Sequence, residues 1–329
     1  MKNFVDFLFS KLLSNRVYFL LILLVLVVVI MSAISPFFLS LGTILDITRM
    51  GTVLMLLALG QTLVILAGGA GIDLSVGATL SLSGVFFGLM VKAGMNVWAA
   101  GVLTVFIGGL LGTVNSITVA WWGVPPLVGT LGTMWIYGAL ALVITNGIPI
   151  SGFPEKFGFL AAGNILGIPS QIILVAVPVF LILQYLVART FIGRWIYLTG
   201  VNSTAARFSG IPVTRVRFFI YTLSGMLAGI GAVVMSSWLM TARADAGNGL
   251  ELQSITVAVL GGTNIFGGFG SMLGTLLAVL IVTLVASGLQ LGNINAIWQL
   301  AVLGLILLGA VALNQYISSY TAKRLGISS

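Results

Sequence analysis

The sequence contains no cysteine and no histidine. Without cysteine the chain can form neither a disulfide nor a thiolate metal site, and without histidine it lacks the commonest proton shuttle and metal ligand. Charged residues are scarce too, at 6% of the 329 residues, whereas soluble globular proteins have about 25%. Apolar residues make up 59% of the chain, and the mean hydropathy is +1.21. This composition excludes a soluble globular protein and indicates an integral membrane protein.

Motifs of the common enzymes and nucleotide-binding proteins are missing as well. None of the five lysines follows a glycine-rich loop of the P-loop type, so the chain cannot hold nucleotide phosphates in that way. The signatures of zinc proteases and serine hydrolases are absent. The apolar segments also contain no series of Asp, Glu and His residues of the kind that proton-driven carriers use. We therefore expect a protein without a catalytic site, cofactor or metal of its own, which is either passive or driven from outside.

Long stretches of the chain carry no charged residue at all. These blocks are residues 50–72, 93–154, 157–188, 218–242 and 252–322. Divided at Gly, Pro and Asn residues, and together with Val17–Ile34 and Leu74–Val91, they predict about ten transmembrane helices of about 20 residues each. The expected fold is an all-α polytopic membrane protein with one transmembrane domain over residues 1–329 and with short or broken helices in both halves.

The N-terminus has the basic residues and apolar run of a signal peptide. The apolar run Val17–Ile34 is longer than a usual signal-peptide core, and no clear small-x-small cleavage site precedes Pro36. We interpret this segment as a retained first transmembrane helix.

The distribution of basic residues predicts the orientation. Ten of the fourteen can be assigned to one side: Lys2, Lys11, Arg16, Arg189, Arg194, Arg207, Arg215, Arg217, Lys323 and Arg324. Because basic residues accumulate on the cytoplasmic side, both termini and the central segment are predicted to be cytoplasmic. An even number of spans agrees with ten. The net charge of +8 thus belongs to membrane loops, and we expect no nucleic-acid partner.

The central segment, residues 189–217, contains five arginines and no acid. We predict that it is a cytoplasmic loop with one short helix at about residues 203–209. Asn202-Ser203-Thr204 offers a helix N-cap, and Gly210 and Pro212 end the helix. The residues assigned to this site are Asn202, Ser203, Thr204, Ala205, Ala206, Arg207, Phe208 and Gly210.

A helix of about two turns is not stable alone in water. We therefore expect it to dock on a partner protein that performs the energetic work. The alternative is a basic loop held by lipid headgroups.

Two glycine-dense segments, GGAGIDLSVG (68–77) and GGTNIFGGFG (261–270), stand in comparable places in the two halves. Each precedes a helix rich in small residues. Glycine interruptions in corresponding positions of two halves indicate a duplicated transport fold with broken helices, although the identity between the two segments is too low to define a repeat. The helix-break residues are Gly68, Gly69, Asp73, Ser75, Gly77, Gly261, Gly262, Gly268 and Gly270.

Asp73 is the one acid deep in the apolar sequence. It is expected to cap the following helix by accepting N–H groups near Ser75 and Val76; the alternative is a site for a transported ion or proton. Uncharged polar residues in or near the spans are candidates for a solute pathway, although hydrogen bonds between helices use the same residue types. These candidates are Gln61, Asn115, Asn264 and Gln299.

Three segments together resemble the membrane permeases of bacterial ABC sugar importers of the ribose, galactose, xylose, rhamnose and autoinducer-2 type. They are GQTLVILAGGAGIDLSVGATLSLSG (60–84), GVNSTAARFSGIPV (200–213) and VAVLGGTNIFGGFGSMLGTLLAVLIV (257–282). The resemblance implies a pore of two permease chains in the inner membrane, either two copies or a pair of siblings. It further implies a cytoplasmic ATPase that binds ATP and magnesium, a periplasmic sugar-binding protein, and a coupling helix after Gly200 that enters a cleft on the ATPase.

Two departures from the family pattern concern these motifs. Thr204 stands where family members often have an acid, which is expected to change the charge pairing with the ATPase. GGAGIDLS has two residues more than the usual GGIDLS, which alters the surroundings of Asp73. The alternative function is an ATP-independent carrier or facilitator for a small polar solute, with sodium coupled through backbone carbonyls at the glycine breaks. A non-transporting scaffold would not explain polar groups and glycine breaks in both halves.

Overall fold

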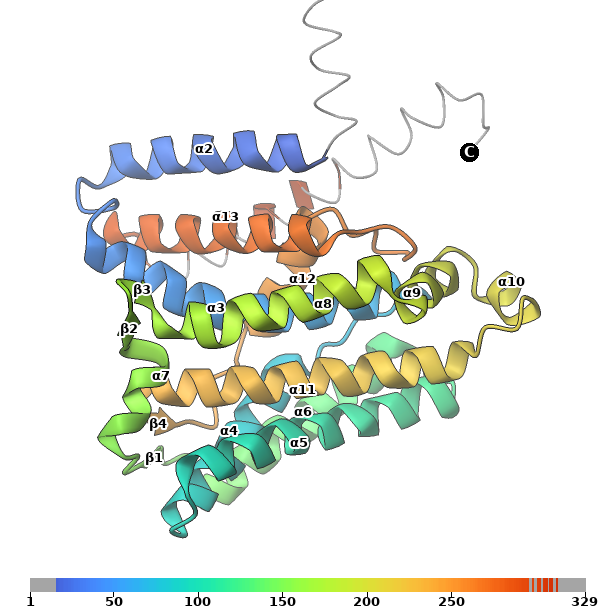
Figure 1. Ribbon diagram of the computed structural model, residues 1–329, viewed down its shortest axis with the longest axis horizontal. Helices are drawn as coiled ribbons and strands as arrows, with labels where there is room; N and C mark the ends of the chain where they lie inside the picture. Colours follow the sequence, from blue (N-terminus) through green and yellow to red (C-terminus); the bar gives the residue numbers. More distant parts are fainter. Residues whose placement is uncertain are drawn as a thin grey trace, which may run out of the picture.

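The computed structural model describes residues 16–295 and, beyond them, residues 298, 301, 302, 304–306, 308, 309 and 312. Long helices lie side by side and run along one common direction (Figure 1). They are α2 (Arg16–Ile34), α3 (Leu41–Leu66), α4 (Val76–Lys92), α5 (Val97–Ser116), α6 (Pro126–Thr145), α8 (Val177–Arg189), α11 (Val213–Leu239) and α13 (Met272–Leu291). The predicted helical, multi-pass architecture is confirmed.

Within these described residues, seven helices are long and apolar enough to cross a membrane. The number of ten spans is not confirmed. Two of the predicted spans form shorter apolar helices, α4 with 17 residues and α12 (Leu250–Leu260) with 11 residues, because each adjoins a glycine-rich break. The predicted last span follows Asn295 and, with the pathway candidate Gln299, lies largely outside the described residues.

The second span begins earlier than the charge pattern predicted. A start near Met50 was expected because Asp46 and Arg49 suggested a loop. In the structure these two residues lie inside α3 and form an ion pair of 2.9 Å. The helix begins after Ser40, whose hydroxyl accepts a hydrogen bond from the Thr43 N–H. An (i, i+3) pair satisfies both charges on one helix surface, so the charges did not mark the helix boundary.

Short elements gather at one end of the bundle, away from the end that carries α9 and α10 (Figure 1). Here β1 (Ile150–Ser151) pairs with β4 (Thr241–Ala242) in an antiparallel ribbon that joins loops of the two halves. The segment between α6 and α8, predicted to be irregular, contains further short elements. These are η2 (Glu155–Gly158), α7 (Phe159–Ala162), the pair β2 (Asn164–Ile165) and β3 (Ile168–Pro169), and the π-helix η3 (Ile172–Ala176).

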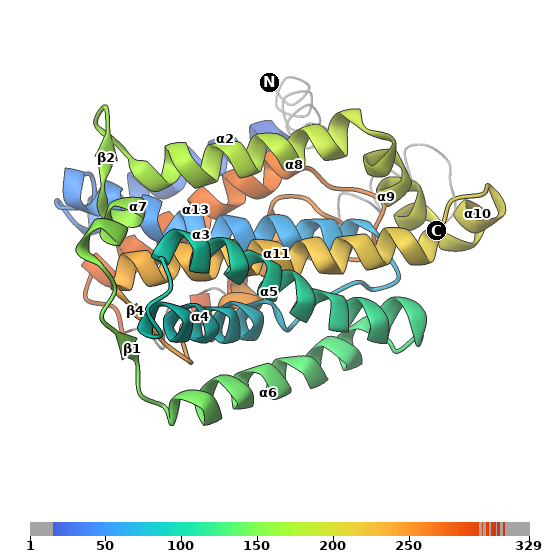
Figure 2. The ribbon, with the colours of Figure 1, turned by 60° about the horizontal axis from the view of Figure 1, so that its bottom comes forward.

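Helices α3 and α11 form the centre of the molecule, between α8 on one side and α6 on the other (Figure 2). Helix α11 packs against α3, α4 and α5. Its contact with α5 is close because glycines face each other: a methyl group on Gly225 would overlap the Gly108 carbonyl oxygen and lie 2.8 Å from the Gly112 Cα. Small residues allow helix backbones to approach closely in membranes, where packing drives association. Helix α5 then continues into a second π-helix, η1 (Ile117–Trp121).

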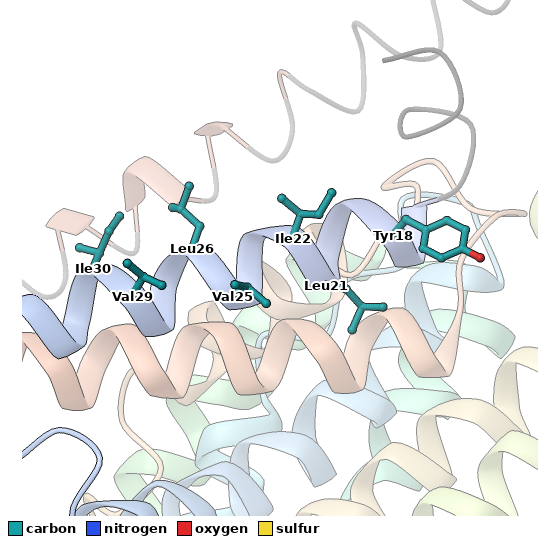
Figure 3. Close-up of a pocket in the computed structure, with 7 residues that line it drawn as sticks. All are labelled: Tyr18, Leu21, Ile22, Val25, Leu26, Val29 and Ile30. Atoms are coloured by element: carbon teal, nitrogen blue, oxygen red, sulfur yellow. The ribbon is translucent and has the colours of Figure 1, made fainter. Parts of the chain in front are cut away.

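The outer helices expose apolar side chains, as expected for contact with lipid. Figure 3 shows an open groove whose lining side chains all come from α2. They are Tyr18, Leu21, Ile22, Val25, Leu26, Val29 and Ile30. Because Tyr18 carries the only hydroxyl among them, this groove suits lipid acyl chains and offers little to a polar solute.

Candidate functional site

The central arginine-rich segment contains two helices where one was predicted. Helix α9 (Phe191–Val201) begins after Thr190, whose hydroxyl accepts from the Gly193 N–H at 3.2 Å, and it buries Ile196 and Thr199. Helix α10 (Ser203–Phe208) follows after a single residue. Residues 189–201 were predicted to belong to a cytoplasmic loop because the segment 189–217 is rich in arginine and contains no acid. The cap at Thr190 was the signal that could have revealed α9.

Helix α10 is present within one residue of its predicted bounds. The Asn202 side-chain oxygen accepts from the Thr204 N–H at 3.0 Å and from the Ala205 N–H at 2.9 Å. At the other end Gly210 has a φ of +82°, and the Ile211 N–H donates to the Ala206 carbonyl at 3.0 Å. Both ends are therefore satisfied locally, with a left-handed glycine after the last turn.

Helix α10 projects at the end of the bundle (Figure 1), and it has a buried and an exposed face. Ala206 points inward and is only 5% exposed, whereas Phe208 is 90% exposed. Thr204, Ala205 and Arg207 are exposed as well. The helix thus presents an apolar side chain and a cation away from the bundle, and its inner face anchors it.

Four arginines of the segment 189–217, at the end of the bundle that carries α9 and α10, are exposed: Arg189, Arg194, Arg207 and Arg215. In the part of the chain that the structure describes, the ion pairs are formed by Arg49 with Asp46 and by Arg243 with Asp245. The four arginines therefore have no acidic partner among the described residues. This end of the molecule is suited to a partner or a lipid surface with negative charge.

The two glycine-dense breaks lie in contact with each other beside this site. The first follows α3, where Gly68, Gly69 and Ala70 all have positive φ angles. The second follows α12, and its Gly268 N–H donates to the carbonyl of Leu66, the last residue of α3, at 3.0 Å. The sequence predicted both breaks. Their contact, which joins the two halves, was not predicted.

The remaining predicted break glycines are in close contact with other segments or have a positive φ angle. Gly77 and Gly261 lie against the backbones of Gly247 and Gly274, Gly262 has a φ of +102°, and Gly270 packs on Thr263.

Asp73 is fully buried next to the first break. Its Oδ1 accepts from the Ser75 N–H at 2.9 Å and from the Ser75 hydroxyl at 2.7 Å. The predicted bond to the Ser75 N–H is thus present, and Ser75 directly precedes Val76, the first residue of α4. Gln61 on α3, with its amide oriented to suit both groups, donates to the Asp73 carbonyl and accepts from the Asp73 N–H, each at 3.1 Å.

A buried chain of hydrogen bonds extends from Ser75 to α5 and α6. Asn115 donates to the Ser75 hydroxyl at 2.6 Å and accepts from the Thr133 hydroxyl at 2.6 Å. Thr130, one turn earlier on α6, has its hydroxyl 3.1 Å from the Leu74 nitrogen and 3.1 Å from the Ile72 carbonyl oxygen. Neither threonine was predicted as a site residue, because a single Thr on an apolar helix carries no distinctive signal. The cluster ties α3, α4, α5 and α6 together around the break.

The pathway candidates thus have different positions. Gln61 and Asn115 form hydrogen bonds between elements inside this cluster, in line with the alternative that such residues join helices. Asn264 lies in the second break, where its Oδ1 accepts from the Phe266 N–H at 3.0 Å and shapes the loop. Their contribution to a solute pathway stays a prediction.

Asn115→Ala is expected to destabilise the protein by about 1–3 kcal/mol, because it leaves the Ser75 and Thr133 hydroxyls buried without this partner. Thermal unfolding of the purified protein in detergent measures the change. Val114→Ala is the control, since Val114 adjoins Asn115 on α5 but is exposed. Equal melting temperatures for the two variants would contradict a stabilising role of the cluster.

A groove of about 240 Å³ lies between α3, α8 and α13. Thr48 and Thr52 are its polar side chains, and their hydroxyls donate to the backbone of their own helix, at 2.7 Å to Leu45 and 2.8 Å to Thr48. These hydroxyls are thereby occupied. The groove is apolar in character and offers no ready set of donors and acceptors to a sugar.

At the end of the bundle opposite α10, Arg243 holds Asp245 by two hydrogen bonds of 2.9 and 2.8 Å. The hydrogen bonds from this guanidinium lower the pKa of the Asp245 carboxyl below its ordinary value. Close by in the fold, Phe87, Phe153 and Phe157 form an aromatic cluster with ring centroids 5.3 to 5.5 Å apart. The loops at this end are therefore well packed, with an exposed ion pair beside them.

Comparison with known proteins agrees with this architecture. Residues 43–311 match the family model described as branched-chain amino acid transport system / permease component. The autoinducer 2 import system permease protein LsrD of Yersinia enterocolitica is 39% identical over 259 residues, covering 75% of this chain and 78% of the relative. The protein of the same name from Photorhabdus temperata is 38% identical over 247 residues, covering 73% and 74%. No solved structure matches the chain.

The family model covers most of the chain, and it includes both glycine breaks, the Asp73 cluster and α10. The resemblance inferred from the three sequence motifs is confirmed. The chain belongs to the branched-chain amino acid transport system permease family and is a permease of the ABC importer type.

Proposed function

We propose that this chain is the membrane-spanning subunit of an ATP-binding-cassette importer in the bacterial inner membrane. In this proposal it forms, with a second permease chain, the pathway for a sugar or a sugar-like solute. The observation that carries the proposal is α10, a capped helix that projects from the bundle with Phe208 exposed and with four exposed arginines at the same end of the bundle. A membrane protein without a nucleotide site of its own needs such a contact to receive work from an ATPase.

The ATPase partner would hold ATP and magnesium and would receive α10 in a surface cleft. Phe208 suits an apolar pocket in that cleft, and Arg207 suits acidic residues at its edge. Thr204, at the start of the helix, adds no charge, so the pairing with the ATPase would rely on the arginines. Because basic residues favour the cytoplasmic side, the α10 end and both chain termini are assigned to the cytoplasm.

The opposite end of the bundle would then face the periplasm, where a sugar-binding protein delivers the solute. The Asp73 cluster is closed by its own hydrogen bonds, and the grooves on α2 and between α3, α8 and α13 are apolar. These features favour a pathway that a second permease chain, a copy or a sibling, completes. The relatives named for autoinducer 2 import support a small sugar-like solute as the substrate.

The mechanism follows from two conformations of the pair. ATP binding would draw the two ATPase subunits together, the two α10 helices would move with them, and the helix bundles would turn so that the pathway faces outward. Only contacts that differ between the two states can transmit this movement.

Uptake into proteoliposomes tests the proposal. The permease pair is reconstituted with the ATPase and the binding protein. It is expected to take up labelled solute only when ATP is present on the side of the membrane that carries the ATPase. Omission of the ATPase, the binding protein or ATP should each reduce uptake to the level of empty vesicles. Uptake by the permease alone, down a solute gradient or with sodium, would contradict the proposal and favour a carrier.

A further inference from the structure

The last turn of α9 and the first turn of α10 are joined without a flexible linker. Asn202 ends α9, since its N–H donates to the Leu198 carbonyl at 3.2 Å, and the same residue caps α10 with its side chain. One residue therefore belongs to the hydrogen-bond patterns of both helices. A displacement of α10 must be passed to the C-terminal end of α9.

The end of α9 touches both glycine breaks through backbone atoms. A methyl group on Gly200 would overlap the Leu66 carbonyl oxygen, at the end of α3, and the Gly268 nitrogen, in the second break. A methyl group on Gly68 would lie 2.7 Å from the Gly200 Cα, and one on Gly268 would lie 2.9 Å from the Val201 nitrogen. We call this three-way contact of Gly68, Gly200 and Gly268 the glycine junction.

Two hydrogen bonds hold the glycine junction together. The Gly268 N–H donates to Leu66, as described above, and the Tyr197 hydroxyl on α9 donates to the Gly270 carbonyl at 2.8 Å. The junction therefore connects α9 to the second break directly, and the second break to the end of α3. Gly68 and Gly268 have φ angles of +72° and +77°, which side chains rarely adopt, so these positions are suited to glycine for conformation as well as for space.

Backbone contact decides how movement passes through the junction. Where side chains separate two elements, a small shift can be absorbed by a change of rotamer. At the glycine junction Gly68 and Gly200 lie against backbone atoms of the neighbouring segments, and Gly268 lies against both the backbone and the side chain of Val201. A shift of α9 is therefore expected to move the end of α3, the second break, or both. Packed contacts of this kind change between discrete arrangements and do not deform continuously.

We propose that the glycine junction is the element that transmits movement of α10 to the broken helices of both halves, with Tyr197 and Gly200 as its positioning residues. The inference rests on the proposed function, since it assigns the route by which the ATPase stroke reaches the transmembrane helices. The first break leads through Asp73 into α4, and the second leads into α13. Movement at the glycine junction would thus shift the broken helices of both halves together.

The test compares solute uptake with ATP hydrolysis in the complete reconstituted importer. Tyr197→Phe removes one hydroxyl and adds no atom, and Gly200→Ala inserts a methyl group into the junction. Both variants are expected to retain the ATPase on co-purification and to hydrolyse ATP. The uptake per ATP hydrolysed should fall by roughly 2- to 30-fold, the range for residues that carry coupling between sites, with the larger loss for Gly200→Ala.

Two control variants separate coupling from stability. Tyr185→Phe removes the hydroxyl of an exposed tyrosine on α8 and should leave uptake per ATP unchanged. Gly229→Ala, at the α5–α11 contact where a methyl group would lie 2.7 Å from the Thr104 carbonyl oxygen, should lower the yield of assembled complex without changing that ratio. If Gly200→Ala does not assemble, Tyr197→Phe decides the question.

The wild-type arm distinguishes the two failures. A wild-type chain that binds no ATPase or transports without ATP would overturn the proposed function, and the assignment of the junction with it. A coupled wild type together with a Tyr197→Phe variant of normal uptake per ATP would overturn the junction alone. A ratio that falls in Tyr197→Phe and stays constant in Tyr185→Phe supports it.

Discussion

Phe208→Asp is expected to abolish ATP-driven uptake while the protein still inserts and folds. The phenyl ring is 90% exposed at the tip of α10 and makes little contribution to the fold of the chain itself. Aromatic side chains that fill a pocket on a partner commonly contribute about 2–4 kcal/mol to binding, so its loss should weaken ATPase binding by roughly 30- to 1000-fold. A carboxylate at this position would also offset part of the positive charge of the nearby arginines and would repel acidic groups on the partner.

Co-purification of the ATPase and uptake in proteoliposomes measure this effect. The matched control is Phe37→Asp, because Phe37 is also an exposed phenylalanine, at 69%, but lies in the turn between α2 and α3, at the end of the bundle away from α10 (Figure 1). Normal ATPase binding by Phe208→Asp would contradict the assignment of α10 as the docking helix. A loss in both variants would indicate a general effect of the added charge.

Two other substitutions, one in α10 and one just after its end, are expected to abolish coupling by a different route. Ala206→Glu places a charge on the buried inner face of α10. The helix must then detach from the bundle or bury an unpaired carboxylate. Gly210→Trp forces a side chain onto a left-handed backbone position; no atom lies within 4 Å of its Cβ site, so the strain is conformational. Normal ATP-driven uptake by either variant, at normal expression, would count against the proposal.

Gly225→Val should prevent accumulation of the folded protein. Gly225 lies where α11 crosses α5, and even a methyl group there would overlap the Gly108 carbonyl oxygen. Valine adds two further methyl groups, so the two central helices would have to separate. Overpacking typically costs about 1–3 kcal/mol and occasionally more, and we expect the upper end because both contacting surfaces are backbone.

The yield of monodisperse protein in detergent, and its melting temperature, measure this loss. Gly132→Val is the matched control: Gly132 is likewise inside a long apolar helix, α6, but has no atom within 4 Å of its Cβ position. The control should retain near-normal yield, since valine meets no neighbouring atom at its Cβ there and its helix propensity is slightly higher than that of glycine. Equal yields of the two variants would contradict the close α5–α11 packing.

Local patterns predicted the parts of the structure that local hydrogen bonds create. Helix α10 was found within one residue because its start depends on Asn202 and its end on Gly210, and both residues act on their immediate neighbours. The bond from Ser75 to Asp73 was predicted for the same reason. Where charge was taken as a sign of a loop, the prediction was wrong, because Asp46 and Arg49 satisfy each other on the surface of α3.

Contacts between distant segments could not be predicted from these patterns. Thr133 has no feature in the sequence that distinguishes it from other threonines, and it gains its role only because α6 brings it to Asn115. Gly200 likewise has no feature in the sequence that distinguishes it from the other glycines. Its role arises because α9, a helix that was not predicted, places it against Gly68 and Gly268.

Composition and local motifs by themselves determined that the chain is a helical membrane protein, where its helices break, and where its short projecting helix begins and ends. These properties depend on the transfer of apolar residues from water and on hydrogen bonds between near neighbours, both of which can be read along the chain. The tertiary structure alone decided that the two glycine breaks and the end of α9 meet, and that the hydrogen-bond cluster beside Asp73 joins four helices. Such contacts depend on how complete helices pack. A glycine in the sequence shows that close approach is possible at that position, but it does not identify the segment that approaches.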